Sequence, residues 1–431
     1  MAIVSHTTLI ANPQRPPHGK LDNMPRLMQS IHFAVLIPLV FVMQVIGIET
    51  TTVFRNGTDG YPVFRIPAIV RAANGDLLAF CEARQAGDAS EIDLVLKRSS
   101  DGGLTWSRLK VVQESDEFRD RLGPNPPPIT VGNPAPVVDQ LDPQYAGRIW
   151  LPFTLENDRV FVTYSDDHGN SWSPAKEITD RVKRPTWGWY ATGPVHSIQI
   201  QQGVHRGRLV VPCDHRLGVA GQDRGVNGAH VVYSDNHGQT WQLGAVDDSY
   251  QDPLNANETS VVELNDGQLY FNTRDQNGSA PGTRGFAYSP DAGQSFAPPP
   301  DDEQFKFFAP TDVYLDPPVV QCALQRVSSQ RNGDPTNLIL FSGPDENGPT
   351  GKGRSDLRIR YSTDETRSWH DGVLLHVGPA AYSDMVVIPT RPRRVGVLFE
   401  AGPPEAERYD RILFSTLGIE ELQVTERPNG K

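Results

Sequence analysis

SSDGGLTW, at residues 99–106, is the stretch of sequence that decides the fold. The pattern Ser-x-Asp-x-Gly-x-Thr/Ser-aromatic returns twice in good form, as SDDHGNSW at 165–172 and SPDAGQSF at 289–296. Two altered copies complete the set: 234–241 has Asn236 at the Asp position, and 362–369 has Thr366 at the Gly position. A motif that recurs along a chain predicts a repeat architecture, in which each unit stacks on its neighbours.

Each part of the motif suits a tight turn between two strands. The Asp carboxylate can accept hydrogen bonds from turn amides, Gly can adopt a positive φ, and the aromatic ring can pack between neighbouring sheets. Between the copies the chain reads as short strands, and no long helical period appears. Examples of the expected strands are 147–155, 159–165, 207–213, 229–234 and 337–342.

These turns resemble the Asp-boxes of the sialidase superfamily. A spacing of about 64 residues over about 380 residues gives roughly six units, which is within the range of propeller blades. The resemblance implies an all-β fold, a six-bladed β-propeller over residues 50–431. Asp-boxes are scaffold, so we expect the turn aromatics to lie between blades and away from the ligand face; they are Trp106, Trp172, Trp241, Phe296 and Trp369.

Composition limits the partners. The chain has 40 basic and 52 acidic side chains, a net charge of −12, which disfavours nucleic acid or an anionic membrane surface as a partner. An anionic ligand would need a local basic cluster. The three cysteines, Cys81, Cys213 and Cys322, show no zinc-type spacing.

The first 49 residues are expected to form an N-terminal extension. Residues 31–48, IHFAVLIPLVFVMQVIGI, are apolar and follow Arg26, as in a signal-peptide core or a short anchor. A buried strand or helix is the alternative interpretation. Export predicts a secreted, periplasmic or cell-envelope protein, with membrane contact only through this segment.

The family resemblance extends to three arginines that would bind a substrate carboxylate. Arg65 lies in Phe-Arg-Ile-Pro at 64–67, Arg274 in FNTRD at 271–275, and Arg360 in IRYS at 359–362. Three guanidinium groups suit one carboxylate, because their planar forks give paired hydrogen bonds and keep their charge. Arg358 and Arg391 compete with Arg360 for the third position.

The segment CEARQAGD at 81–88 is expected to carry the general acid/base. By resemblance Asp88 takes that role, and Arg84 supports the substrate carboxylate or the ring substituents. The loop looks short, so Glu91 and Asp93 remain rivals for the acid/base role.

The resemblance implies that Tyr382, in AYSD at 381–384, is the nucleophile. A phenol has a reference pKa near ~10, so attack at neutral pH needs a nearby carboxylate to accept its proton. Glu258 fits that role better than Glu263, which lies inside a strand-like run. Glu400 resembles the family's closing carboxylate, which holds Arg65.

Through this resemblance, the residues together imply an exo-α-sialidase that cuts terminal sialic acid from glycoproteins, glycolipids or oligosaccharides with retention of configuration. The partners would be sialylated glycans, and no cofactor or metal is implied. One alternative is a non-catalytic glycan-binding propeller, which would keep the Asp-boxes and lose the polar set. A trans-sialidase or a sialic-acid lyase using the same site is the other.

Overall fold

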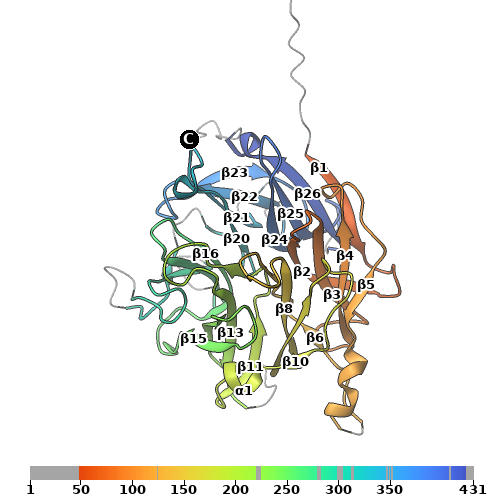
Figure 1. Cartoon of the computed structure of the whole chain (residues 1–431). Coiled ribbons are helices and arrows are strands. Elements are labelled where there is room, and N and C mark those ends of the chain that lie inside the picture. The colour runs from red at the N-terminus through yellow and green to blue at the C-terminus, as the bar shows by residue number, and fades with distance from the viewer. Residues whose placement is uncertain are drawn as a thin grey trace, which may run out of the picture. The chain divides into compact units, whose positions relative to one another are not determined.

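The computed structural model describes residues 48–123, 125–219, 225–278, 283–298, 304–311, 315–345, 348, 350, 353–406 and 409–423. The expected apolar segment at 31–48 lies, apart from Ile48, outside the described residues. Within the described residues the strands form six sheets arranged as the blades of a β-propeller (Figure 1). The predicted all-β, six-bladed fold is confirmed.

The first three blades follow each other along the chain. Blade 1 contains β2 (Val63–Arg71), β3 (Leu77–Arg84), β4 (Ile92–Ser99) and β5 (Lys110–Gln113). Blade 2 contains β6 (Val131–Gly132), β7 (Val137–Asp139), β8 (Arg148–Leu155), β9 (Arg159–Ser165) and β10 (Lys176–Glu177). Blade 3 contains β11 (Trp187–Thr192), β12 (Ile198–Gln199), β13 (Leu209–Leu217), β14 (Asn227–Ser234) and β15 (Gln242–Val246).

The second half repeats the pattern. Blade 4 contains β16 (Ala256–Glu263), β17 (Leu269–Asp275), β18 (Arg284–Ser289) and β19 (Ala309–Pro310). Blade 5 contains β20 (Ala323–Ser328), β21 (Leu338–Pro344), β22 (Leu357–Ser362) and β23 (His370–Leu374). Blade 6 contains β24 (Ala380–Ile388), β25 (Arg394–Ala401), β26 (Arg411–Gly418) and β1 (Glu49–Arg55). The short helices are η1 (Ser115–Arg121), α1 (Thr179–Val182), η2 (Gln330–Asn332) and η3 (Ile419–Gln423).

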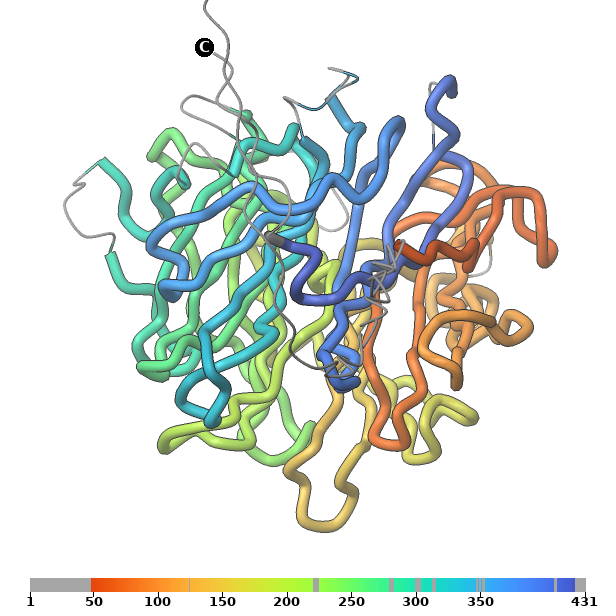
Figure 2. The backbone as a smooth tube through the Cα atoms, turned by 90° about the horizontal axis from the view of Figure 1, so that it is seen from above, coloured from red at the N-terminus to blue at the C-terminus, as the bar shows by residue number. Residues whose placement is uncertain are grey.

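Blade 6 is completed from both ends of the described chain. β1 pairs antiparallel with β26, from Glu49 opposite Thr416 to Arg55 opposite Arg411. Figures 1 and 2 both show the red β1 beside the blue strands of the last blade. This pairing closes the ring, so the blade has no unpaired edge at β26.

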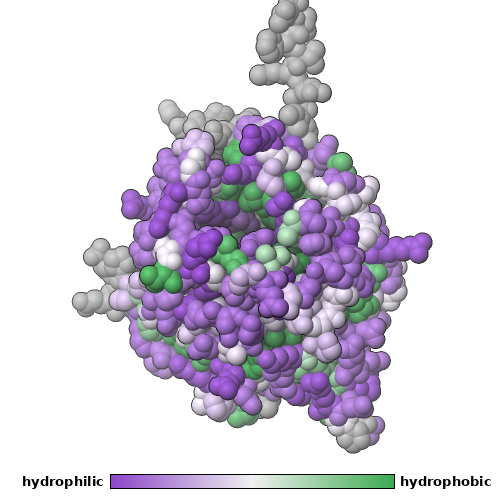
Figure 3. Space-filling view, in the orientation of Figure 1, coloured by the Kyte–Doolittle hydropathy of each residue, from purple (hydrophilic) through white to green (hydrophobic). Residues whose placement is uncertain are grey.

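The first strands of the blades surround the centre. β2 packs against β24, β24 against β20, and β20 against β16. Adjacent pairs of blades share apolar clusters, for example β2–β4 with β8 and β9 around Phe80, Phe153 and Phe161. The face shown in Figure 3 is mostly hydrophilic, with hydrophobic residues in small separate areas.

The Asp-box turns have the hydrogen bonds that their sequence predicts. In the first copy, Ser99 Oγ accepts from the Gly103 amide at 2.8 Å and donates to Asp101 Oδ1 at 2.7 Å. Asp101 Oδ1 also accepts from the Thr105 amide at 3.0 Å. Donation from the Thr105 hydroxyl and amide and from the Ser99 hydroxyl lowers the pKa of Asp101 to about 2.

Both altered copies keep this geometry. Asn236 Oδ1 accepts from the Thr240 amide at 2.9 Å, as the Asp carboxylate does elsewhere. Thr366 takes the left-handed conformation of the replaced Gly, with φ of 69°, and its amide donates to Ser362 Oγ at 3.0 Å.

The five turn aromatics pack against the preceding blade, or against blade 6 in the case of the first copy. The contacts are Trp106 with Phe414, Trp172 with Phe80, Trp241 with Trp150, Phe296 in a cluster with Val210 and Val231, and Trp369 with Tyr270. The expected position between blades is confirmed.

Candidate active site

One pocket of about 520 Å³ collects polar side chains from all six blades. Its charged lining residues are five arginines and four acids: Arg65, Arg84, Arg216, Arg274, Arg354, Glu82, Asp88, Glu156 and Glu258. Tyr382 lies among them, and none of the five turn aromatics lines the pocket. The turn aromatics therefore lie outside the pocket that contains the arginines.

At the base of the pocket Tyr382 contacts a carboxylate and a guanidinium. The phenol donates a hydrogen bond to Glu258 Oε1. Arg274 Nη1 donates to Glu258 Oε2 at 2.7 Å and lies 3.3 Å from the Tyr382 oxygen. Glu258 therefore accepts from both groups, in the arrangement needed for a base beside a weak nucleophile.

The phenol is neutral in this arrangement. Burial and the negative charge of Glu258 raise the pKa of Tyr382 above its ordinary value, although Arg274, Arg354 and Arg65 act in the opposite direction. A buried phenolate would lie next to a carboxylate, so the proton has to leave the oxygen as a new bond forms rather than beforehand.

Three guanidinium groups surround the Tyr382 ring. Arg65 Cζ lies 5.4 Å and Arg354 Cζ 5.8 Å from the ring centroid, while Arg274 contacts the phenol oxygen. Arg65 comes from blade 1, Arg274 from blade 4, and Arg354 from the connection before β22. A carboxylate beside the ring would be within their reach, with charge-assisted hydrogen bonds from planar donors.

Glu400 holds two parts of this cluster. Its Oε1 accepts from Arg65 Nε at 2.6 Å and from the Ile66 amide at 2.9 Å. Its Oε2 accepts from the Tyr382 amide at 3.3 Å. Glu400 is fully buried and outside the pocket lining, so it acts on Arg65 and on the Tyr382 backbone rather than on a ligand.

On the blade 1 side, Arg84 lies between two acids. Its Nε donates to Glu82 Oε2 at 2.9 Å, and its Nη1 pairs with Asp88. Glu82 Oε1 accepts from the Asn133 amide at 2.8 Å. The Asp88 side chain is 88% exposed, which places it at the pocket rim. Partial desolvation at the rim raises the pKa of Asp88, but the charge and hydrogen bond of Arg84 outweigh it and lower that pKa.

The expected position of Arg360 is wrong. Arg360 is 1% exposed in β22 and donates from Nη2 to Asp316 at 2.8 Å and to Asp345 at 3.3 Å. β22 is the third strand of its blade, so its side chains lie farther from the centre than those of first strands and their preceding loops. Arg354, which no motif in the sequence marks, is the blade 5 arginine in the pocket.

The two alternative arginines, Arg358 and Arg391, also lie outside the pocket. Arg358 pairs with Asp345 at 2.6 Å, and Arg391 is exposed in the connection between β24 and β25. Neither arginine lines the pocket.

The three rival acids have partners of their own away from the pocket. Glu91 pairs with Arg119, Asp93 accepts from Tyr61 Oη and the Ser115 amide, and Glu263 accepts from two backbone amides. The pocket therefore brings together Arg65, Arg84, Asp88, Glu258, Arg274 and Tyr382 and leaves out these rivals.

Several lining residues had no sequence signal that pointed to a site. Asn133 follows the two-residue strand β6, and Trp189 and Arg216 lie opposite each other on β11 and β13. The Arg216 guanidinium lies 4.8 Å from the Trp189 ring. Asn257 could have been suspected from the sequence, because it directly precedes the candidate base Glu258.

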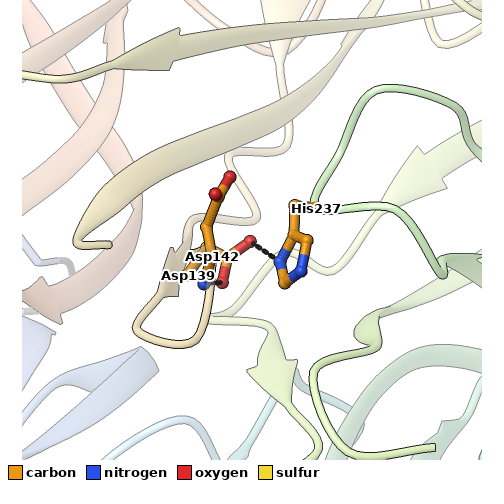
Figure 4. Close-up of side chains that lie close together, drawn as sticks. All are labelled: Asp139, Asp142 and His237. Atoms are coloured by element: carbon orange, nitrogen blue, oxygen red, sulfur yellow. Dashed lines mark hydrogen bonds and ion pairs between the residues drawn. The ribbon is translucent and has the colours of Figure 1, made fainter. Parts of the chain in front are cut away.

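A second polar cluster lies between blades 2 and 3. His237 Nδ1 is 2.8 Å from Asp139 Oδ2, and Asp142 lies beside them (Figure 4). Asp139 Oδ1 accepts from the backbone amides of Leu141 and Asp142, and Asp142 Oδ1 accepts from those of Gln144 and Tyr145. These contacts fix a turn against the altered Asp-box of blade 3, which is a structural role.

Comparison with known proteins agrees with the fold and the motif. A model of the BNR repeat-like domain family matches residues 67–392. A sialidase of Micromonospora viridifaciens is 29% identical over 375 residues, covering 84% of this chain and 53% of that protein. Sialidase-3 of Mus musculus is 25% identical over 423 residues, covering 85% of this chain and 94% of that protein. The chain thus spans about half the length of the bacterial relative.

Solved structures show the same architecture. The Hadza microbial sialidase Hz136 superposes with a TM-score of 0.69 and 25% identity, covering 86% of this chain and 69% of that chain. The intramolecular trans-sialidase from Ruminococcus gnavus superposes with a TM-score of 0.67 and 18% identity, covering 87% of this chain and 98% of that chain. No helix among the described residues is long and apolar enough to cross a membrane. With the Asp-boxes, the six blades and the family match together, the chain belongs to the BNR repeat-like domain family of the sialidase superfamily.

Proposed function

We propose that the protein is an exo-α-sialidase that releases terminal sialic acid from glycans and retains the anomeric configuration. The observation that carries the proposal is the buried contact of Tyr382 with Glu258 and Arg274 inside a pocket with three arginines around the phenol ring. A non-catalytic glycan-binding propeller would have no need for a phenol hydrogen-bonded to a buried carboxylate. Relatives named as sialidases support the substrate class.

In the proposed first step, Arg65, Arg274 and Arg354 bind the substrate carboxylate. The Tyr382 oxygen attacks the anomeric carbon while its proton passes to Glu258. The bond to the leaving oxygen breaks, and protonated Asp88 gives that oxygen its proton. The products are the free aglycone and a sugar joined to Tyr382.

In the second step, water attacks the anomeric carbon and Asp88 takes the proton from that water. The bond to Tyr382 breaks, and Glu258 returns its proton to the phenol oxygen. Two displacements at one carbon give retention. Asp88 is paired with Arg84, so the acid role requires Asp88 to be protonated when the substrate is bound.

A neutral nucleophile suits this substrate. Sialic acid carries its carboxylate on the anomeric carbon, so an ionised Asp or Glu would approach against like charge in a poorly screened site. The neutral phenol of Tyr382 avoids that repulsion. The Glu258 carboxylate contacts the phenol oxygen and not the anomeric carbon.

The test is release of sugar from a fluorogenic aryl sialoside, with the product identified by chromatography and mass spectrometry. Free sialic acid with initially retained configuration supports the proposal. Binding of sialosides without turnover would support the glycan-binding alternative. An anhydro or unsaturated product would show transfer within the sugar or elimination instead.

We also propose that the segment at 31–48 directs the protein out of the cytoplasm. Fractionation of cells that express the full chain tests this location.

A further inference from the structure

A chain of hydrogen bonds behind the pocket starts at Arg216. The Arg216 guanidinium is stacked on Trp189, and its Nε donates to Asn227 Oδ1 at 2.6 Å. Asn227 in turn lies 3.1 Å from the side-chain amide of Asn257, which lines the pocket. Asn227 and Asp214 are buried and do not line it.

The polarity of this chain is fixed at one end. A guanidinium has donors and no acceptor, so the Asn227 atom that contacts Arg216 must be the oxygen. That same oxygen faces Asn257, so the Asn257 atom that approaches it must be the NH₂ group. Oxygen and nitrogen of an amide are assigned from such networks, and here the network allows one answer.

Asp214 supports the same orientation. Its Oδ2 accepts from Asn257 Nδ2 at 2.8 Å, so both protons of the Asn257 amide have acceptors. Asp214 is fully buried on β13, and its Oδ1 has no hydrogen-bond partner among the described residues. Burial, with Glu258 nearby, raises the pKa of Asp214 well above its ordinary value.

The backbone of Asn257 is held as firmly as its amide group. Its N–H donates to Thr273 Oγ1 at 3.1 Å, and its carbonyl accepts from the hydroxyls of Thr259 and Thr273. The pairing of β16 with β17 shifts register between Ala256 and Thr259, which is a bulge. Consecutive strand residues normally face opposite sides, and a bulge lets Asn257 and Glu258 both face the pocket.

One atom of the Asn257 side chain is then left for a ligand. Both amide protons are used behind the pocket wall, and no described residue donates to Oδ1. The pocket wall therefore presents a fixed acceptor directly beside the proposed base Glu258.

We propose that Asn257 is a specificity-determining residue whose Oδ1 accepts a hydrogen bond from one hydroxyl or amide N–H of the bound sugar. Asp214, Asn227 and Arg216 are positioning residues that prevent the amide from turning its NH₂ group into the pocket. The inference rests on the proposed function and refines it. A site with a fixed acceptor rejects an analogue that lacks the matching donor, because the acceptor is then buried without a partner.

The experiment compares kcat/KM for the 4-methylumbelliferyl glycoside of N-acetylneuraminic acid with that of analogues each lacking one donor. The set contains the 4-, 7-, 8- and 9-deoxy sugars and an N-methylacetamido sugar. In the natural protein one analogue should fall by about 10-fold or more relative to the parent. In Asn257→Ala the parent should fall and that same analogue should not, so that their ratio approaches one.

Two further variants separate orientation from folding. Asn227→Leu leaves Asn257 in place and removes the acceptor next to it, so the ratio should shrink. Asp214→Asn can still offer an oxygen to Asn257 Nδ2, so the ratio should persist. A parent-to-analogue ratio that is the same in the natural protein, Asn257→Ala and Asn227→Leu overturns the inference while hydrolysis of the parent stands. A natural protein that releases nothing from the parent overturns the proposed function and this inference with it.

Discussion

Glu400 Oε1 accepts a hydrogen bond from Arg65 Nε at 2.6 Å although 335 residues separate them in the chain. The contact joins β2, the first strand of blade 1, to β25 of blade 6, and Glu400 also holds the Tyr382 amide. One carboxylate thus links a proposed substrate-binding residue to the proposed nucleophile.

Glu400→Gln should therefore reduce both stability and activity. The variant leaves the Arg65 charge without its buried partner, and we expect the free energy of unfolding to fall by about 3 kcal/mol. Urea unfolding followed by tryptophan fluorescence measures it. The conservative exchange Glu420→Gln, on the short helix η3, is the control and should change it little. A Glu400 variant as stable as the natural protein would contradict the linking role.

Tyr382 should become covalently modified during turnover. A 3-fluoro sialosyl fluoride has a good leaving group and slows breakdown of the intermediate, so the adduct should accumulate on the proposed nucleophile. Peptide mass spectrometry locates it. Tyr382→Phe should remain unlabelled and should lose most of its kcat. An adduct on a carboxylate-containing peptide, or full activity in Tyr382→Phe, would assign the attack to another residue.

Arg84→Gln should move the pH profile upward. Arg84 favours ionised Asp88, so its removal raises the pKa of Asp88, and the protonated acid persists to higher pH. Because protonated Asp88 is the proposed active form, activity is lost as pH rises through this pKa. We expect the alkaline limb of kcat/KM for sialyllactose, which reports the free enzyme, to shift to higher pH.

The matched variant is Asp88→Asn. It should lose most activity on sialyllactose and much less on an aryl sialoside, because an activated phenol departs without a proton. An alkaline limb that stays in place in Arg84→Gln, or moves to lower pH, would show that another group titrates there.

Alanine variants of Arg354 and Arg360 should have opposite effects: the first should lower activity, and the second should lower stability. Arg354→Ala removes a pocket guanidinium and should lower kcat/KM by about 100-fold, with unfolding little changed. Arg360→Ala leaves Asp345 buried without one of its partners and should lower the free energy of unfolding by about 3 kcal/mol, with KM preserved. Kinetics and urea unfolding on both variants decide this. A higher KM in Arg360→Ala with an unchanged Arg354→Ala would restore the assignment made from sequence.

Thr366→Gly should stabilise the protein. A β-branched residue at φ of 69° is strained, and Gly adopts this conformation freely, so the gain should be about 1 kcal/mol. Thermal unfolding measures it. At Gly169, where φ is +82° and an added Cβ would lie 2.7 Å from Leu78, Gly169→Ala should destabilise. A less stable Thr366→Gly would mean that packing of the Thr side chain outweighs the strain.

The fold was predictable because its signal is local and repeated. A turn that needs Ser, Asp and Gly at fixed offsets can be read directly from the sequence, even where Asn236 or Thr366 replaces one member. The expected strands at 159–165 and 229–234 lie within β9 and β14. The N-terminal strand β1 was not predicted, because its partner is at the other end of the chain.

The site was only partly predictable. Residues on or beside first strands, such as Arg65, Glu258 and Tyr382, reach the pocket because those strands surround the centre. The neighbourhood of a turn motif favoured Arg360, yet a residue's distance from the centre depends on which strand of the blade carries it. Arg354 lies in a connection with no periodic pattern, and the opposition of Trp189 and Arg216 depends on strand pairing.

The closure of blade 6 by β1 has a consequence for how the protein is made. Thr50 and Ser415, which are 2.6 Å apart, are separated by 365 positions, so β1, the first strand of the described residues, must wait for β26 to be synthesised. Until then β1 has no partner, and the Glu400 contact to Arg65 must likewise wait until β25 has been synthesised. A ribosome-bound chain that stops before β25 can build early blades but cannot close the ring, and Arg65 of blade 1 stays without Glu400. The proposed activity should therefore appear abruptly with the final strands rather than grow blade by blade.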